Sequence, residues 1–201
     1  MMVSILPCYK SAPLLERLAA WLGCLLLCLL PLTLQAETRH LDVQFAELVP
    51  LDNRYVVNAS LTGEPPARIE ELVQGGVVMP FIVEFSLHKP RWYWFNEVIT
   101  EQTLDIRLAY HALTRQYRLN VGGVTHSFAS FEQAFSALRS LRNWPVLERG
   151  QLRPGESYEA ALRLRLDTAQ LPKPFQVASL SGRDLNLSTG WTRWTFINPL
   201  K

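Results

Sequence analysis

The sequence predicts an α+β fold dominated by β structure, an antiparallel sheet or sandwich of about seven or eight strands with two helices packed on it. Beyond residue 40, apolar residues mostly alternate with polar ones, as they do in strands with one covered face. Turn signals rather than helices separate most of these segments, so βαβ units are not predicted. Only two segments carry the period of an amphipathic helix. The chain shows no internal repeat or low-complexity run.

The first 36 residues have the order of a secretion signal. Lys10 and Arg17 precede an uncharged apolar stretch that ends at Ala36, a small residue suited to cleavage. We therefore expect residues 1–36 to be a signal peptide and the protein to be periplasmic or otherwise in the cell envelope. Two alternatives stay open. The stretch is at the short end of what spans a bilayer, which allows an uncleaved anchor, and Cys24 resembles a lipid-attachment site.

The remaining residues, 37–201, are expected to form a single soluble β-rich domain. All three cysteines of the chain precede residue 37, so the domain must be stable without disulfides. Removing Lys10, Arg17 and Glu16 from the whole-chain counts of 20 basic and 18 acidic residues leaves 18 and 17. A net charge this small argues against a nucleic-acid partner. It argues equally against binding to an anionic membrane surface, so the leader, if uncleaved, is the only predicted membrane contact.

The first elements follow from alternation and from breakers. Residues 41–45, with the odd-numbered ones facing the core, and residues 55–61 are predicted to pair as antiparallel strands across a turn at 50–53. Two prolines and two glycines bracket residues 67–74, which predicts a short helix closed by a glycine cap. Residues 77–87 are nearly all apolar and indicate a strand covered on both faces.

An aromatic segment follows this strand. Residues 91–95 read RWYWF, so a strand there would carry aromatic side chains on both faces. Core packing is the favoured interpretation, with a partner interface and a stacking platform as alternatives. The same alternatives apply to Trp191 and Trp194 in the last predicted strand, 191–197. These two tryptophans lie on opposite faces of that strand, so one should lie outside the core and is a candidate contact for a partner.

Two hairpins are predicted in the middle of the chain. In residues 104–110 and again in residues 117–121, apolar side chains alternate with polar ones, which predicts two strands. Gly122-Gly123 suits a primed two-residue turn from the second of them into a strand at 124–128. Val121 would then face Val124.

The second helix and the later strands are predicted from caps and alternation. Ser130 and Gln133 form a capping box for a helix that runs towards Pro145. A further strand is expected over 156–167, and the proline-containing stretch 172–174 is predicted to be irregular.

Four segments, RWYWFNE, YHALTRQYRL, LRLRLDTAQLPKPFQV and GWTRWTF, resemble the bacterial family called domain of unknown function 4390. The resemblance covers nearly the whole chain after the leader. It implies a short, exported, proteobacterial protein, and it implies no activity. Members of the family are often encoded beside a membrane sensor histidine kinase, which suggests an accessory to envelope signalling. The resemblance supplies no site residues.

Motifs for catalysis, metal binding or cofactor binding were not found. The sequence has no nucleophile elbow, and neither glycine pair is followed by the lysine and hydroxyl residue of a phosphate loop. The histidines occur singly and lack a second ligand at helical or hairpin spacing. We therefore expect no metal and no cofactor. The histidines are His40, His88, His111 and His126.

An arginine face is the boldest prediction. If the strands 104–110 and 117–121 pair with Leu108 opposite Tyr117, then Arg107 lies opposite Arg118. Like charges placed directly across a strand pair are unfavourable unless an anion or a carboxylate lies between them. The strand at 156–167 carries Arg163 and Arg165 on its polar face. If that strand lies adjacent, the arginines form either a patch that attracts an anionic ligand or a solvated face neutralised by nearby acids.

The sequence thus favours a non-enzymatic exported binding or interaction module whose partner is an envelope protein or an anionic ligand. The alternative is an enzyme whose site is assembled from dispersed residues such as His111, Arg115 and Tyr117. The candidate contact residues of the module are Arg107, Arg118, Arg163, Arg165, Trp191 and Trp194.

Overall fold

A computed structural model of the chain describes residues 41–93, 95–181, 185 and 187–199. The predicted signal peptide, residues 1–36, lies outside the described residues. Within the described residues, no helix combines the length and the apolar character needed to cross a bilayer.

Across the described residues the chain forms nine β-strands and three α-helices. The strands are β1 (Leu41–Leu51), β2 (Arg54–Gly63), β3 (Met79–Lys89), β4 (Glu97–His111), β5 (Gln116–Val121), β6 (Val124–Phe128), β7 (Ser140–Glu148), β8 (Ser157–Leu166) and β9 (Thr192–Ile197). The helices are α2 (Ala67–Gln74), α3 (Phe131–Leu138) and α4 (Lys173–Ser181).

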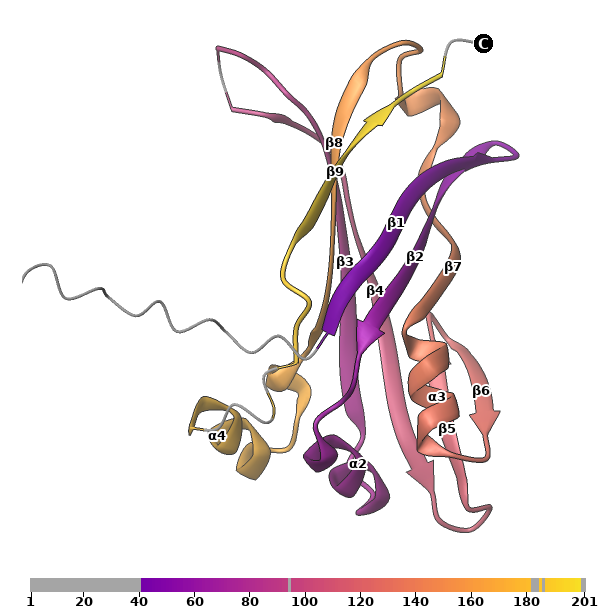
Figure 1. The fold of residues 1–201 in the computed structure, drawn as a ribbon, viewed down its shortest axis with the longest axis vertical. Coiled ribbons are helices and arrows are strands. Elements are labelled where there is room, and N and C mark those ends of the chain that lie inside the picture. Colours follow the sequence, from indigo (N-terminus) through magenta and orange to yellow (C-terminus); the bar gives the residue numbers. More distant parts are fainter. Residues whose placement is uncertain (1–40, 94, 182–184, 186, 200–201) are drawn as a thin grey trace, which may run out of the picture. The chain divides into compact units, whose positions relative to one another are not determined.

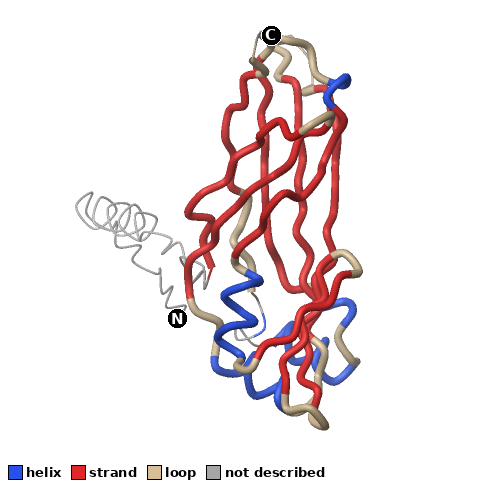
Figure 2. Tube along the Cα trace, turned by 90° about the vertical axis from the view of Figure 1, so that its right-hand side faces the viewer, coloured by secondary structure: helices blue, strands red, loops and turns tan. Residues whose placement is uncertain are grey.

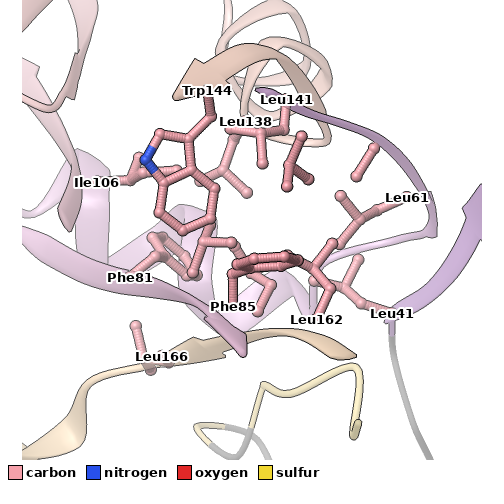
Figure 3. Packing of buried hydrophobic residues seen from close by; sticks show 14 of the residues in the cluster. Leu41, Leu61, Phe81, Phe85, Ile106, Leu138, Leu141, Trp144, Leu162 and Leu166 are labelled. Atoms are coloured by element: carbon pink, nitrogen blue, oxygen red, sulfur yellow. The ribbon is translucent and has the colours of Figure 1, made fainter. Parts of the chain in front are cut away.

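The strands form two antiparallel sheets that face each other as a sandwich (Figure 1). One sheet has the order β1-β2-β7, and the other has the order β6-β5-β4-β3-β8-β9. The core lies between them: Figure 3 shows Trp144 and Leu61 of the smaller sheet across from Phe81, Phe85 and Leu162 of the larger one. The predicted fold class, α+β with β dominant, is confirmed, with more strands and one more helix than expected.

Two predicted local structures are present in detail. Gly122 and Gly123 adopt φ of 53° and 93°, and Val121 faces Val124 across the turn, as the glycine pair predicted. The Ser130 side chain accepts a hydrogen bond from the backbone N–H of Gln133 and caps α3. Helix α2 has the predicted bounds because prolines precede it and Gly75-Gly76 ends it.

Three predictions about local structure are wrong. Helix α3 ends at Leu138, and the following residues form β7, which tolerates Pro145 because β7 is at the edge of its sheet. The stretch around 172–174 enters helix α4 instead of an irregular segment. The register of β1 shifts between Val43 and Phe45, and the Phe45 side chain is exposed instead of facing the core.

The three helices gather at one end of the long strands, as Figures 1 and 2 both show. Strand β4 runs from that end to the other: it pairs with β5 near the helices and with β3 along most of its length. At the opposite end, the loop between β3 and β4 stands clear of both sheets (Figure 1). The two sheets are joined by a buried hydrogen bond from the Tyr55 hydroxyl on β2 to Asn198, which follows β9.

Candidate interaction surface

The most exposed aromatic side chains of the described residues lie in the loop between β3 and β4. Trp92 is 94% exposed, Phe95 is 83% exposed and Tyr93 is 66% exposed. The rings of Trp92 and Tyr93 contact each other edge to face with centroids 5.3 Å apart. Large aromatic side chains left this open to water are unusual in a folded domain and commonly mark a contact surface. We call residues 91–93 and 95 the aromatic loop.

The prediction that this segment is a strand packed in the core is wrong. Strand β3 ends at Lys89, because Pro90 has no N–H with which to continue the ladder. The chain then bends, and pairing resumes only at Glu97, opposite Lys89. The aromatic residues therefore fall in a turn that lies beyond the end of the core. Trp94 lies outside the described residues.

Ion pairs hold the base of the aromatic loop. Arg91 pairs with Glu97 across the base. Beneath them, the Nζ atom of Lys89 lies 2.7 Å from Oε2 of Glu156, and the Tyr158 hydroxyl donates to the same oxygen at 3.1 Å. The Tyr158 oxygen in turn accepts the backbone N–H of Arg153 at 3.0 Å.

The charges at this base alter two protonation equilibria. The hydrogen bond from Lys89 lowers the pKa of the Glu156 carboxyl against a smaller opposing effect of burial. Burial raises the pKa of the Tyr158 phenol, and the neighbouring Glu156 carboxylate adds to this effect. Glu156 is therefore ionised and Tyr158 neutral near neutral pH, so the base is a stable set of paired groups. A hollow of about 600 Å³ lies between this base and the loop, lined by Trp92, Tyr93 and Arg153 among others.

A second candidate region lies on the outer face of the larger sheet, where two of the predicted arginines are found. Nε of Arg163 donates to Oε2 of Glu84 at 2.6 Å, and Nε and Nη2 of Arg165 each donate to Oε1 at 3.2 Å. Arg165 also lies 3.6 Å from Asp167. Partial burial raises the pKa of Glu84, but the hydrogen bonds and charges of both arginines outweigh it and lower the pKa. The two arginines are thus locally neutralised.

The two predicted tryptophans occupy opposite faces of this region, as their spacing indicated. Trp191 is 38% exposed on the outer face, and the Arg163 guanidinium stacks over its ring at 4.6 Å. Trp194 points inward and packs against the core beside Phe85, with ring centroids 6.3 Å apart. Trp191 is therefore the tryptophan outside the core, although Arg163 already covers part of one face.

A shallow pocket of about 340 Å³ opens next to Trp191. Ser86 on β3 and Ala161 on β8 lie opposite each other in its lining. Because both side chains are small, they leave the volume of the pocket unfilled. Charged residues at its rim include Glu101 and the ion pair of Glu159 with Arg193 at 3.5 Å. The lining of this pocket therefore carries both signs of charge.

The predicted opposition of Arg107 and Arg118 is wrong. Strands β4 and β5 pair with Leu108 opposite Leu119, which places Arg107 opposite Asn120 and Arg118 opposite Ala109. The error is a slip of two residues, which leaves every side chain on its predicted face. No pair of like charges therefore needs an anion at this point of the sheet.

The residues of the alternative enzyme hypothesis do not share one exposed site. His111 and Arg115 lie in and beside the turn between β4 and β5, where His111 contacts Thr114 at 3.1 Å. Tyr117 faces the core and accepts a hydrogen bond from Gln74 at 3.0 Å. Among the described residues, no three histidine, cysteine or acidic side chains are grouped so as to hold a metal ion.

Comparison with protein families matches residues 38–195 to the family described as Domain of unknown function (DUF4390). The match begins just after the predicted leader and includes the aromatic loop and most of β9. No curated protein and no solved structure matches the chain.

Proposed function

This chain belongs to the DUF4390 family, and we propose that it is a non-enzymatic interaction module of the bacterial cell envelope that contacts its partner through the aromatic loop. The observation that carries the proposal is the exposure of Trp92, Tyr93 and Phe95 at the end of the β3–β4 hairpin. Aromatic side chains of this kind supply most of the binding energy in many interfaces.

The base of the loop supports this role. The pairing of Arg91 with Glu97, and of Lys89 with Glu156, fixes the two chain segments from which the aromatic residues emerge. A contact surface that is held in place before binding loses less conformational entropy when it binds. The envelope location is the part of the proposal that derives from the leader sequence, and the family resemblance suggests a membrane sensor kinase as the system that the module assists.

An anionic ligand at the arginines is a weaker proposal. Glu84 already pairs with Arg163 and Arg165, so an incoming anion would have to compete with a carboxylate that is held by several hydrogen bonds. Arg107 and Arg118 do not face each other and offer no shared site.

Photo-crosslinking in living cells tests the proposal. A photoreactive amino acid placed at Tyr93 should form adducts with one envelope component, protein or lipid. The matched control is the same amino acid at Leu113, which is 92% exposed in the turn between β4 and β5. Adducts that are equally weak at both positions would show that the aromatic loop is not the contact surface.

A further inference from the structure

The chemistry of the aromatic loop favours one medium as its partner. Among its described residues, the exposed apolar side chains are all aromatic: Trp92, Tyr93 and Phe95. Tryptophan and tyrosine combine an apolar ring with a polar atom, and they concentrate where the headgroups of a bilayer meet its hydrocarbon. We propose that the aromatic loop inserts into the interfacial layer of a phospholipid bilayer, an inference that rests on the function proposed above.

The exposure of Trp92 separates this proposal from a flat protein partner. At 94% exposure Trp92 is almost fully accessible, and its ring meets that of Tyr93 only edge to face. A rigid protein surface without a pocket covers one side of such a ring, whereas a fluid headgroup layer closes around it. The position of the loop agrees with this: it stands clear of both sheets, so its tip can be immersed while the sheets stay in water (Figure 1).

The charges at the base of the loop indicate what drives insertion. Lys89 and Arg91 are each paired with a glutamate, and Arg153 is the additional cation, 3.9 Å from Glu156. These five groups carry three positive and two negative charges, a local net charge of +1. Insertion is therefore driven mainly by apolar burial, with a modest added attraction to anionic lipids. We expect affinities for anionic and zwitterionic membranes to differ by less than about tenfold.

Tryptophan fluorescence in vesicles tests the proposal directly. The full chain is mixed with vesicles of phosphatidylcholine alone or of phosphatidylcholine with phosphatidylglycerol, each with brominated acyl chains that quench nearby tryptophan. Trp92→Phe keeps an aromatic ring and removes one fluorophore. The difference between wild type and Trp92→Phe isolates the Trp92 signal, so the readout is local even where the leader also binds the vesicles. We expect this difference signal to be quenched in both kinds of vesicle.

A double variant adds a test of affinity. Trp92→Ser with Tyr93→Ser should lower vesicle partitioning at least about tenfold, because two exposed aromatic rings no longer enter the interface. Leu113→Ser is the matched control, since it removes an equally exposed apolar side chain from the turn at the opposite end of β4, and should leave partitioning unchanged. Where the leader alone holds the chain on vesicles, the quenching difference decides.

The outcomes separate this inference from the proposed function. Quenching of the Trp92 signal supports membrane insertion. An unquenched Trp92 signal together with specific crosslinking of Tyr93 to a protein would overturn the membrane inference and leave the interaction module in place. An unquenched signal with no preference for crosslinking at Tyr93 over Leu113 would overturn both.

Discussion

The two ends of the sandwich carry similar side chains in opposite environments. At the end covered by helices, Tyr117, Phe131 and Phe135 are buried in a chain of ring contacts with centroid distances of 5.8 Å. At the other end, Trp92, Tyr93 and Phe95 are open to water. The difference comes from the covering element, because α3 lies against β5 and β6, whereas the aromatic loop extends beyond the strands. The same residue types thus contribute to stability at one end and are exposed to water at the other.

The largest effect is expected at the covered end. Phe135→Ala removes a ring that is 2% exposed and stacked on Phe131, and it should lower the free energy of unfolding by about 3–5 kcal/mol. Urea unfolding followed by circular dichroism measures the change. A loss below about 1 kcal/mol would mean that α3 does not seal this end, and the contrast between the two ends would disappear.

A smaller effect is expected at the turn that places β6 beneath α3. Gly123 has a φ of 93° and open space around the position of a Cβ atom, so Gly123→Val acts through backbone strain alone. It should cost about 1–3 kcal/mol. Gly123→Asn is the control, because asparagine tolerates positive φ better, and it should lie closer to wild type. Equal urea midpoints for all three proteins would contradict the assigned turn.

Between the two ends, Glu84 should make stability depend on pH. Glu84→Gln leaves Arg163 and Arg165 without their carboxylate and should cost about 1–2 kcal/mol near pH 7, a modest value because the groups are partly exposed. The folded-state pKa of Glu84 lies below its ordinary value of 4.5, so its contribution is present above that pH and is lost as the pH falls through the folded-state pKa. Wild type and variant should therefore converge in acid. Glu159→Gln, which breaks a more exposed pair, should change stability by less than about 0.5 kcal/mol.

The smallest effect on stability is expected at the open end. Trp92→Ala and Tyr93→Ala should each leave the free energy of unfolding within about 0.5 kcal/mol of wild type, because these rings bury little surface on folding. Thermal melts at matched protein concentration measure this. Destabilisation beyond about 1 kcal/mol would show that the loop is part of the core and that the two ends do not differ in this way.

The sequence predicts features that depend on local chemistry. The glycine pair at 122–123, the cap at Ser130 and the bounds of α2 each follow from what one or two residues permit in the backbone. Alternation likewise predicts that one of Trp191 and Trp194 packs in the core, and Trp194 does so.

Features that depend on position along a strand are less accessible. Alternation does not predict the register of β4 and β5, because a slip of two residues keeps every side chain on the same face. Nothing in the sequence marks the left-handed backbone of Arg115, which shapes the turn. Alternation also cannot distinguish aromatic residues in the core from aromatic residues beyond the end of a sheet. Pro90 marks the end of the preceding strand, but it does not show whether the aromatic residues after it form a further strand.

The hydrogen bond between Tyr55 and Asn198 has a consequence for the order in which the domain assembles. Its partners are 143 residues apart, so a chain that emerges with its N-terminus first completes this link only when nearly all of it has been delivered. Before β7 has formed and paired with β2, the strands β1 and β2 are a lone hairpin, which is marginally stable by itself. The first hairpin therefore gains its support from β7, and the link from Tyr55 to Asn198 is expected to join the two sheets only afterwards.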